Sequence, residues 1–222
     1  SCGVNFIGNT NPIFINGAVT VTGNFKISNC PNILMGKDAS ILVNSNSSLQ
    51  IETIGSTNST RTTLKAGCNE MWKGIILQDP TSSIILDRST LQDSKIAIES
   101  KYGASYTLKN QAVLNKCNVG IKISNFSGLH PGKMEASYIC CANLFFTPSG
   151  GISAISSTNV YCLAPYAAKT TSIGMYILGS PNQNCIVKVG SPFSTATLFD
   201  QNRFENMAVG ISIEILKRFF LN

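Results

Sequence analysis

Apolar residues alternate with polar ones over short stretches of three to five positions, and polar turns separate the stretches. This alternation has the two-residue period of a β-strand, and no segment sustains the 3.6-residue period of an amphipathic helix. Aliphatic residues occur in runs of two to four, far short of the ~20 that a membrane-spanning helix needs. The pattern therefore predicts an all-β chain of short strands, with no membrane insertion.

A small residue followed by Ile or Met recurs along the chain and serves as an anchor for comparing its segments. The anchor pairs are Gly74-Ile75, Ala97-Ile98, Gly120-Ile121, Gly151-Ile152, Gly174-Met175 and Gly210-Ile211, spaced by 23, 23, 31, 23 and 36 residues. The commonest interval suits one coil of about three short strands, and stacked coils form parallel sheets around a continuous core. The repeat predicts a right-handed parallel β-helix solenoid with roughly eight to ten coils.

Further apolar residues recur at fixed distances before the anchor. One column expected in the core contains Leu91, Leu114, Phe145 and Phe204, a second contains Ile98, Ile121, Ile152 and Ile211, and a third contains Ile85, Leu108 and Ile139. Residues 62–213 hold the regular coils, and residues 12–61 resemble earlier, less regular ones. Residues 214–222 are expected to cap or continue the stack. The whole chain, residues 1–222, is interpreted as one domain.

The stretch GCNEMWKGI, together with STLQDSKIAI and NRFENMAVGI, resembles the β-helix regions of secreted and cell-surface bacterial proteins in the pectin-lyase-like fold group. The resemblance covers about residues 12–213 and implies the fold. It implies little about activity, because that group includes lyases, hydrolases, adhesins and passive stalks. We expect an exported, non-catalytic surface or glycan-binding module. The alternatives are a polysaccharide lyase or glycoside hydrolase, and a structural stalk segment of a larger surface protein.

Composition and charge narrow the possible partners. Only 13% of residues are charged, and the lysines behind the net charge of +6 are scattered without interleaved aromatics, so nucleic-acid binding is not expected. The single histidine and the lack of a CxxC pair among eight cysteines argue against a zinc site, and no metal or cofactor is expected. Most cysteines are interpreted as small buried hydrophobes, with one or two disulfides possible in an exported protein.

Candidate catalytic chemistry is sparse. The resemblance implies clustered calcium-binding acids for a lyase and three aspartates, two of them adjacent, for a hydrolase, but the chain has no Asp-Asp pair. Glu70 and Asp93 are expected on adjacent coils, with Lys116 neutralising the pair at a turn. His130 lies in the loop GLHPGK, and no Ser or Cys stands in a recognisable nucleophile setting. No catalytic residue is therefore assigned.

Candidate binding residues come from the two longer intervals. Their extra 8 and 13 residues fall in the connections 123–139 and 177–198, so both loops should emerge on one side of the solenoid, where repeat proteins often place binding sites. The residues predicted to bind a polysaccharide or cell-surface glycan there are Phe126, His130, Asn182 and Asn184 from the loops, with Glu99, Lys122 and Tyr176 from outward strand positions. Trp72 is expected to face outward, where its indole either covers a turn or stacks against a ligand. An adjoining domain or chain is expected at a β-helix end.

Overall fold

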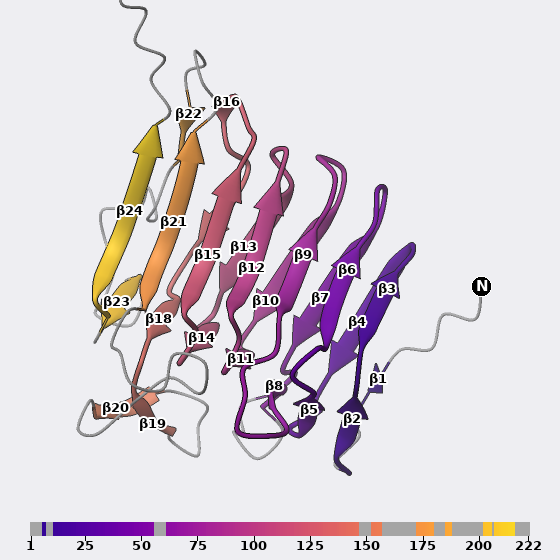
Figure 1. Ribbon diagram of the computed structural model, residues 1–222. Coiled ribbons are helices and arrows are strands. Elements are labelled where there is room, and N and C mark those ends of the chain that lie inside the picture. Colours follow the sequence, from indigo (N-terminus) through magenta and orange to yellow (C-terminus); the bar gives the residue numbers. More distant parts are fainter. Residues whose placement is uncertain are drawn as a thin grey trace, which may run out of the picture.

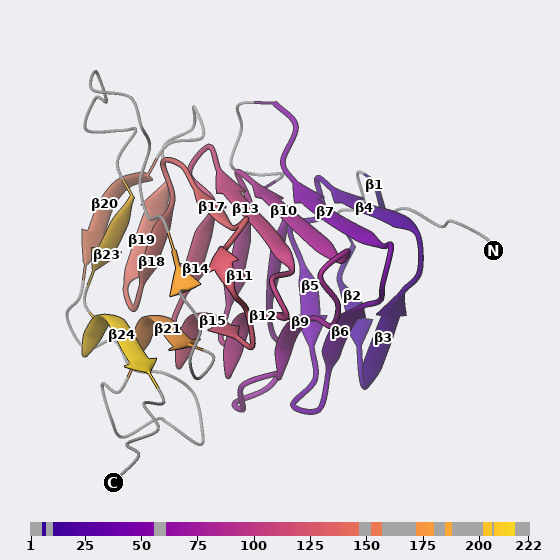
Figure 2. The ribbon, with the colours of Figure 1, turned by 90° about the horizontal axis from the view of Figure 1, so that it is seen from above.

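The structure is a computed structural model that describes residues 6–7, 11–55, 61–146, 152–156, 172–179, 185–187, 202–205 and 207–215. These residues contain no helix, and none of them forms a helical segment able to cross a membrane. The chain passes repeatedly through three parallel sheets, named A, B and C, whose strands stack along one axis (Figures 1 and 2). This stacking is consistent with the predicted parallel β-helix solenoid.

Within each sheet, successive coils contribute neighbouring strands. Sheet A contains β1 (Phe6–Ile7), β4 (Asn24–Ser28), β7 (Ser48–Glu52), β10 (Ser83–Asp87), β13 (Ser105–Lys109) and β17 (Lys133–Met134). Sheet B contains β2 (Ile13–Ile15), β5 (Ile33–Met35), β8 (Thr63–Ala66), β11 (Thr90–Gln92), β14 (Val113–Asn115), β18 (Tyr138–Cys140) and β23 (Arg203–Glu205). Sheet C contains β3 (Ala18–Val21), β6 (Ser40–Val43), β9 (Gly74–Leu77), β12 (Ile96–Lys101), β15 (Val119–Ser124), β21 (Ile173–Gly179) and β24 (Val209–Ile215).

Strand register reproduces part of the repeat. Ile98 pairs with Ile121 in sheet C, and Leu91 pairs with Leu114 in sheet B, so both pairs keep the interval read from the sequence. The third column was wrong at two of its three positions. Leu86 and not Ile85 pairs with Leu108 in sheet A, and Met134 continues that column, whereas Ile139 belongs to sheet B. The connection from β13 to β14 is one residue longer than that from β10 to β11, which shifts the register of sheet A relative to the other sheets.

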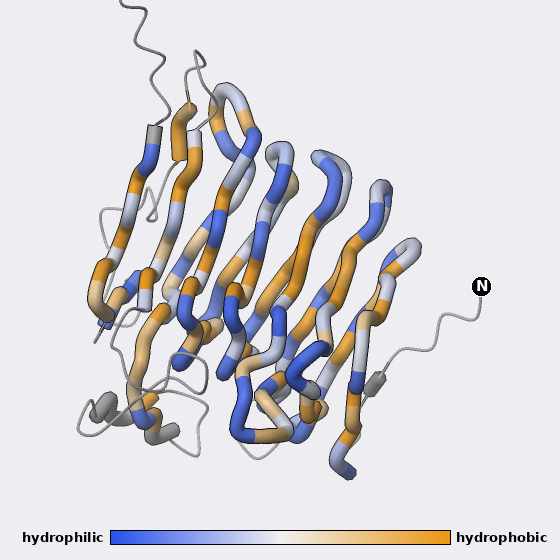
Figure 3. Tube along the Cα trace, in the orientation of Figure 1, coloured by the Kyte–Doolittle hydropathy of each residue, from blue (hydrophilic) through white to orange (hydrophobic). Residues whose placement is uncertain are grey.

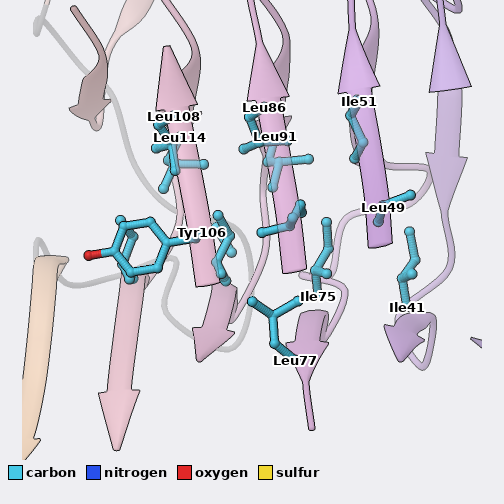
Figure 4. Close-up of a cluster of buried hydrophobic side chains, with 14 of the residues drawn as sticks. Ile41, Leu49, Ile51, Ile75, Leu77, Leu86, Leu91, Tyr106, Leu108 and Leu114 are labelled. Atoms are coloured by element: carbon cyan, nitrogen blue, oxygen red, sulfur yellow. The ribbon is translucent and has the colours of Figure 1, made fainter. Parts of the chain in front are cut away.

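The core lies between the three sheets, where alternate side chains of each strand point inward (Figure 4). Ile75, Leu91, Leu108 and Leu114 are fully buried there. Each such side chain contributes about 1.5–3 kcal/mol through removal from water. Ile211 continues the column of Ile98 and Ile121 but is 43% exposed, because β24 is the last strand described in sheet C. Its predicted burial is therefore wrong, whereas its place in the column is confirmed.

Corners between the sheets use left-handed backbone conformations. Ten non-glycine residues there have φ between 48° and 64°, and they are Asn29, Asn46, Arg88, Asp93, Tyr102, Asn110, Gln111, Lys116, Asn125 and Ala136. Asn and Asp tolerate this conformation best, which explains their enrichment. At one corner these polar side chains also bond between coils, since Asn110 Nδ2 donates to Asp87 Oδ1 at 2.8 Å.

Residues 143–146 and 152–156 leave the stack. β19 (Asn143–Phe146) and β20 (Ile152–Ser156) pair with each other as an antiparallel hairpin. The hairpin packs against outward-facing apolar residues of sheet B, in a cluster of Val113, Tyr138, Cys140 and Ala142 with Leu144 and Ile152. Phe145 and Ile152 are therefore outside the predicted core columns. Ile139 pairs with both Leu114 and Phe204, and β15 pairs directly with β21.

Trp72 was predicted to face outward, and this prediction is wrong. The side chain is fully buried in the core, and its indole Nε1 donates to the carbonyl oxygen of Gln92 at 2.8 Å. Strict alternation from Ile75 would point Trp72 outward, but Gly74 has φ of +107° and breaks the alternation before β9. A Cβ on Gly74 would lie 1.6 Å from the carbonyl oxygen of Ile96, so only glycine fits. Glycine here reverses the direction of the indole.

The cysteines mostly follow the expectation. Six lie within the described residues, where none of the six forms a disulfide, and Cys30, Cys117, Cys140 and Cys141 are buried. Burial raises the pKa of Cys117 to about 12, which makes this thiol a poor nucleophile. Cys2 and Cys162 fall outside the described residues. The disulfide expectation finds no support in the described part of the chain.

Candidate functional site

A hollow of about 400 Å³ lies on the outer face of sheet B. Its lining comes from β8, β11, β14 and the start of the hairpin, and consists of Thr63, Thr90, Gln92, Asn115, Lys116, Ala142, Asn143 and Leu144. Strand alternation explains the polar floor, because Leu64, Leu91 and Leu114 point into the core and their neighbours point out. The hollow is referred to below as the sheet B groove.

Asn115 lies on the floor of the sheet B groove and bonds to Ala142, at the start of the hairpin that forms the wall of the groove. Its Nδ2 donates to the carbonyl oxygen of Ala142 at 3.0 Å, and its Oδ1 accepts from the Ala142 N–H at 3.1 Å. This side chain thus satisfies both backbone groups of Ala142 where the chain turns into the hairpin. Next to it, Lys116 Nζ donates to Asn143 Oδ1 at 3.2 Å on the exposed rim. The groove is therefore held open by side chains rather than formed by a gap in packing.

Charge beside the groove comes from residues behind and next to the lining. Arg61 is 3% exposed, and its Nε donates to Thr90 Oγ1 at 2.9 Å. Burial lowers the pKa of Arg61 to about 10, so the guanidinium remains positive at neutral pH. Burial raises the pKa of Asp93, although Gln92 Nε2 donates to its Oδ2 at 3.0 Å and the positive charge of Lys116 acts in the opposite direction. The groove thus offers hydroxyl, amide and amine groups beside a buried cation.

Three predicted binding residues come together on the outer face of sheet C. Glu99 pairs with Lys122, and Lys122 pairs with Tyr176, on successive strands. Lys122 Nζ lies 3.0 Å from a Glu99 oxygen, Lys101 approaches the other oxygen at 3.6 Å, and the Tyr176 hydroxyl donates to Glu214. Glu99 and Lys122 are therefore already paired with each other, and Tyr176 with Glu214. The sequence therefore predicted their proximity, whereas their role in binding stays a prediction.

The two longer connections do meet on one side. β16 (Gly128–Leu129) pairs in parallel with β22 (Cys185–Ile186), one strand from each connection. Phe126 and His130 are buried, at only 4% and 3% exposed. Their side chains belong to the packing beneath the loops. Asn182 and Asn184 lie outside the described residues, so their predicted role is not tested.

His130 forms a buried hydrogen-bond chain. Its Nδ1 accepts from the Gly132 N–H at 2.9 Å, which assigns the proton to Nε2. Nε2 lies 3.0 Å from Ser100 Oγ, which in turn donates to the carbonyl oxygen of Ala104 at 2.7 Å. A Ser–His contact often signals a nucleophile, but Ser100 is fully buried and its hydrogen points to a carbonyl oxygen. This contact holds the connection 123–139 against β12 of sheet C.

Tyr106 packs against the same cluster, with its ring 5.5 Å from that of His130. Within the described residues, its buried hydroxyl has no hydrogen-bond partner, and burial raises its pKa. We therefore expect Tyr106→Phe to increase the free energy of unfolding by about 1 kcal/mol, because the substitution removes an unsatisfied polar group without changing the ring. Urea unfolding at neutral pH measures this. A loss of stability would show instead that the hydroxyl has a partner.

The expected Glu70–Asp93 pair does not form. Exposed Glu70 lies 3.9 Å from Lys37, whereas Asp93 is 7% exposed and bonds to Gln92. Trp72 pairs with Ser94, so the extra residues before β9 shift Glu70 away from the level of Asp93. Within the described part of the chain, no three His, Cys, Asp or Glu side chains are arranged to hold a metal ion.

Sequence reasoning missed the sheet B groove. Gln92 and Asn115 carry a detectable signal, since they are paired amides one interval apart on adjacent strands. The wall carried no such signal, because the hairpin was interpreted as another coil. No family model matches the chain, and the searches of curated proteins and of solved structures found no match to it. The groove must therefore be interpreted from its own chemistry.

Proposed function

We propose that this chain is a non-catalytic glycan-binding module of an exported surface protein, and that the sheet B groove is its binding site. We further propose that its coils are right-handed and repeat at about 23 residues, as the sequence spacing suggests. The observation that supports binding is the groove itself: an open hollow of about 400 Å³ lined mainly by hydroxyl, amide and amine groups.

Sugar hydroxyls need donors and acceptors at fixed positions. Gln92, Lys116 and Asn143 supply them at the open side of the groove, whereas the nearly buried Thr90 and Asn115 are already bonded to Arg61 and Ala142. Parallel strands place Thr90 and Gln92 beside Val113 and Asn115 at one strand spacing, about 4.8 Å. An extended sugar chain lying across the strands would therefore meet a polar group on each coil. The rigid floor needs little ordering on binding, which favours affinity.

Binding is favoured over cleavage by the composition of the lining. Glycoside hydrolysis requires a pair of carboxyl groups across the bond, and proton abstraction requires a positioned base. The residues that line the groove include no Asp, Glu or His. Elsewhere, Glu52 is occupied by Lys26 at 2.6 Å and Glu99 by Lys122 at 3.0 Å.

Calorimetric titration against a panel of soluble polysaccharides tests the proposal, with product analysis for cleavage. We expect at least one glycan to bind, and Lys116→Ala to weaken that binding about tenfold, the cost of one charge-assisted hydrogen bond. Lys122→Ala is the matched control, because the same residue type lies on an outer face of the adjoining sheet C strand. Equal losses from both variants, or glycan cleavage by the wild type, would contradict the proposal.

A further inference from the structure

The described chain exposes nine large apolar side chains, and the ends of sheet C explain four of them. Val19, Val209, Ile211 and Ile213 belong to the first and last strands of sheet C, where the stack leaves inward residues uncovered. Phe14, on the first strand of sheet B, faces outward, because its neighbours Ile13 and Ile15 pack against the core. The end of the stack does not explain Leu129 and Ile186, which lie along its side and are 54% and 51% exposed.

Leu129 and Ile186 lie side by side. They are register partners in the two-stranded parallel pairing of β16 with β22. This pair of strands lies beyond the ends of the sheet C strands, and its hydrophobic residues are visible there (Figures 1 and 3). The two connections that are longer than the repeat therefore combine to present an aliphatic pair on a projection, called here the loop tip.

Hydrogen bonds and ring packing hold the two connections together beneath the loop tip, at what is called its base. The His130 N–H donates to the carbonyl oxygen of Ile186 at 2.8 Å, and Cys185 Sγ donates to that of Phe126 at 3.1 Å. Phe126 and His130 pack edge to face, with ring centroids 5.1 Å apart. The chain thus uses its apolar and hydrogen-bonding groups to hold the base in place. Leu129 and Ile186 point away from that base and remain exposed.

The surroundings of the loop tip add an aromatic residue and charged side chains of both signs. Tyr102, 53% exposed, lies at the corner between β12 and β13, whose partner strands β15 and β17 flank the connection 123–139. Lys133 is exposed at the start of β17, and exposed Glu135 follows two residues later. On the adjacent face, Lys101 and Lys122 both approach Glu99, and Glu214 accepts from Tyr176. The attraction to anionic lipids therefore rests on the overall charge of the chain.

We propose that the loop tip contacts the surface of a lipid bilayer with anionic headgroups, without crossing it. A projecting aliphatic pair suits a fluid interface, which can close around it. Aliphatic side chains enter the headgroup boundary, tyrosine favours that boundary, and lysine attracts anionic lipids. The overall charge of +6 acts in the same direction. This proposal is independent of the sheet B groove.

Vesicle co-sedimentation tests the contact. The full chain is mixed with vesicles of phosphatidylcholine, with or without one quarter phosphatidylglycerol, at low and at high salt. We expect binding to the anionic vesicles that weakens with salt, and about tenfold weaker binding by the double variant Leu129→Asp, Ile186→Asp. The matched control is Phe14→Asp, which changes another highly exposed apolar residue at the end of the stack. No binding, or equal losses in both variants, would overturn the proposal.

A second measurement does not depend on the double variant folding. Leu129→Trp keeps the tip apolar and adds a fluorophore, while the buried Trp72 gives a constant background. We expect its emission to shift to the blue with anionic vesicles and to be quenched by brominated lipids. An unchanged emission would overturn the proposal. Concentration-dependent self-association that the double variant abolishes would assign the tip to a second copy of this chain and likewise overturn it.

Discussion

Trp72→Ala is expected to lower the free energy of unfolding by about 3–5 kcal/mol, the usual cost of truncating a large buried aromatic residue. The indole is fully buried, and its loss also leaves the carbonyl oxygen of Gln92 without the 2.8 Å hydrogen bond from Nε1. Chemical denaturation, followed by far-UV circular dichroism because the fluorophore is removed, measures the difference. The effect should be among the largest of any single substitution in the chain.

Trp72→Phe is the matched control, because it keeps an aromatic ring and loses only the N–H donor and part of the volume. We expect it to lose less than half as much stability as Trp72→Ala. In the wild type, the tryptophan emission should be blue-shifted relative to the unfolded chain and resistant to iodide quenching. A loss below about 1 kcal/mol for Trp72→Ala would instead support a position on the surface.

Acidification from pH 6.5 to about 4 is expected to remove about 3 kcal/mol of stability through His130 alone. Burial lowers the pKa of His130 from 6.5 to about 4, so the unfolded chain takes up a proton first as the pH falls. The stabilising contribution is therefore complete above pH 6.5 and is lost progressively below it. Both ring nitrogens already have partners, and no carboxylate is among them to stabilise the charged form.

His130→Gln isolates this contribution, because glutamine retains donor and acceptor groups and does not titrate. Its stability should be lower than that of the wild type at pH 7 but should change less between pH 6.5 and 4. The carboxylates are common to both proteins. Glu52, for example, is buried but has a lowered pKa because Lys26 and Ser28 bond to it, so its loss at low pH cancels in the comparison. Equal pH dependence of the two proteins would show that His130 titrates normally.

The sequence predicts the parts of this fold that depend on alternation and spacing. Ile98 with Ile121 and Leu91 with Leu114 follow from a constant interval, because parallel pairing repeats once per coil. The meeting of the two longer loops was also predictable, because loops at the same corner of a solenoid share a side. Glu99, Lys122 and Tyr176 were brought together by the same reasoning.

Local exceptions to alternation could not be predicted in this way. Gly74 reverses the direction of Trp72 through one positive φ angle, which the apolar pattern does not report. The hairpin of β19 and β20 has the same two-residue period as a coil, so periodicity cannot tell which of the two it forms. The sheet B groove depends on that hairpin for its wall. It was therefore missed together with it.

Hydrogen–deuterium exchange in the presence of a bound oligosaccharide tests the central claim, that the sheet B groove holds a glycan. If a glycan from the binding panel occupies it, we expect slower exchange in peptides that cover residues 61–66, 89–93, 113–116 and 142–144. Peptides from the sheet C face, residues 98–101, 119–124 and 173–178, should exchange as in the free protein. Protection confined to those sheet C peptides would contradict the account and return the binding site to Glu99, Lys122 and Tyr176.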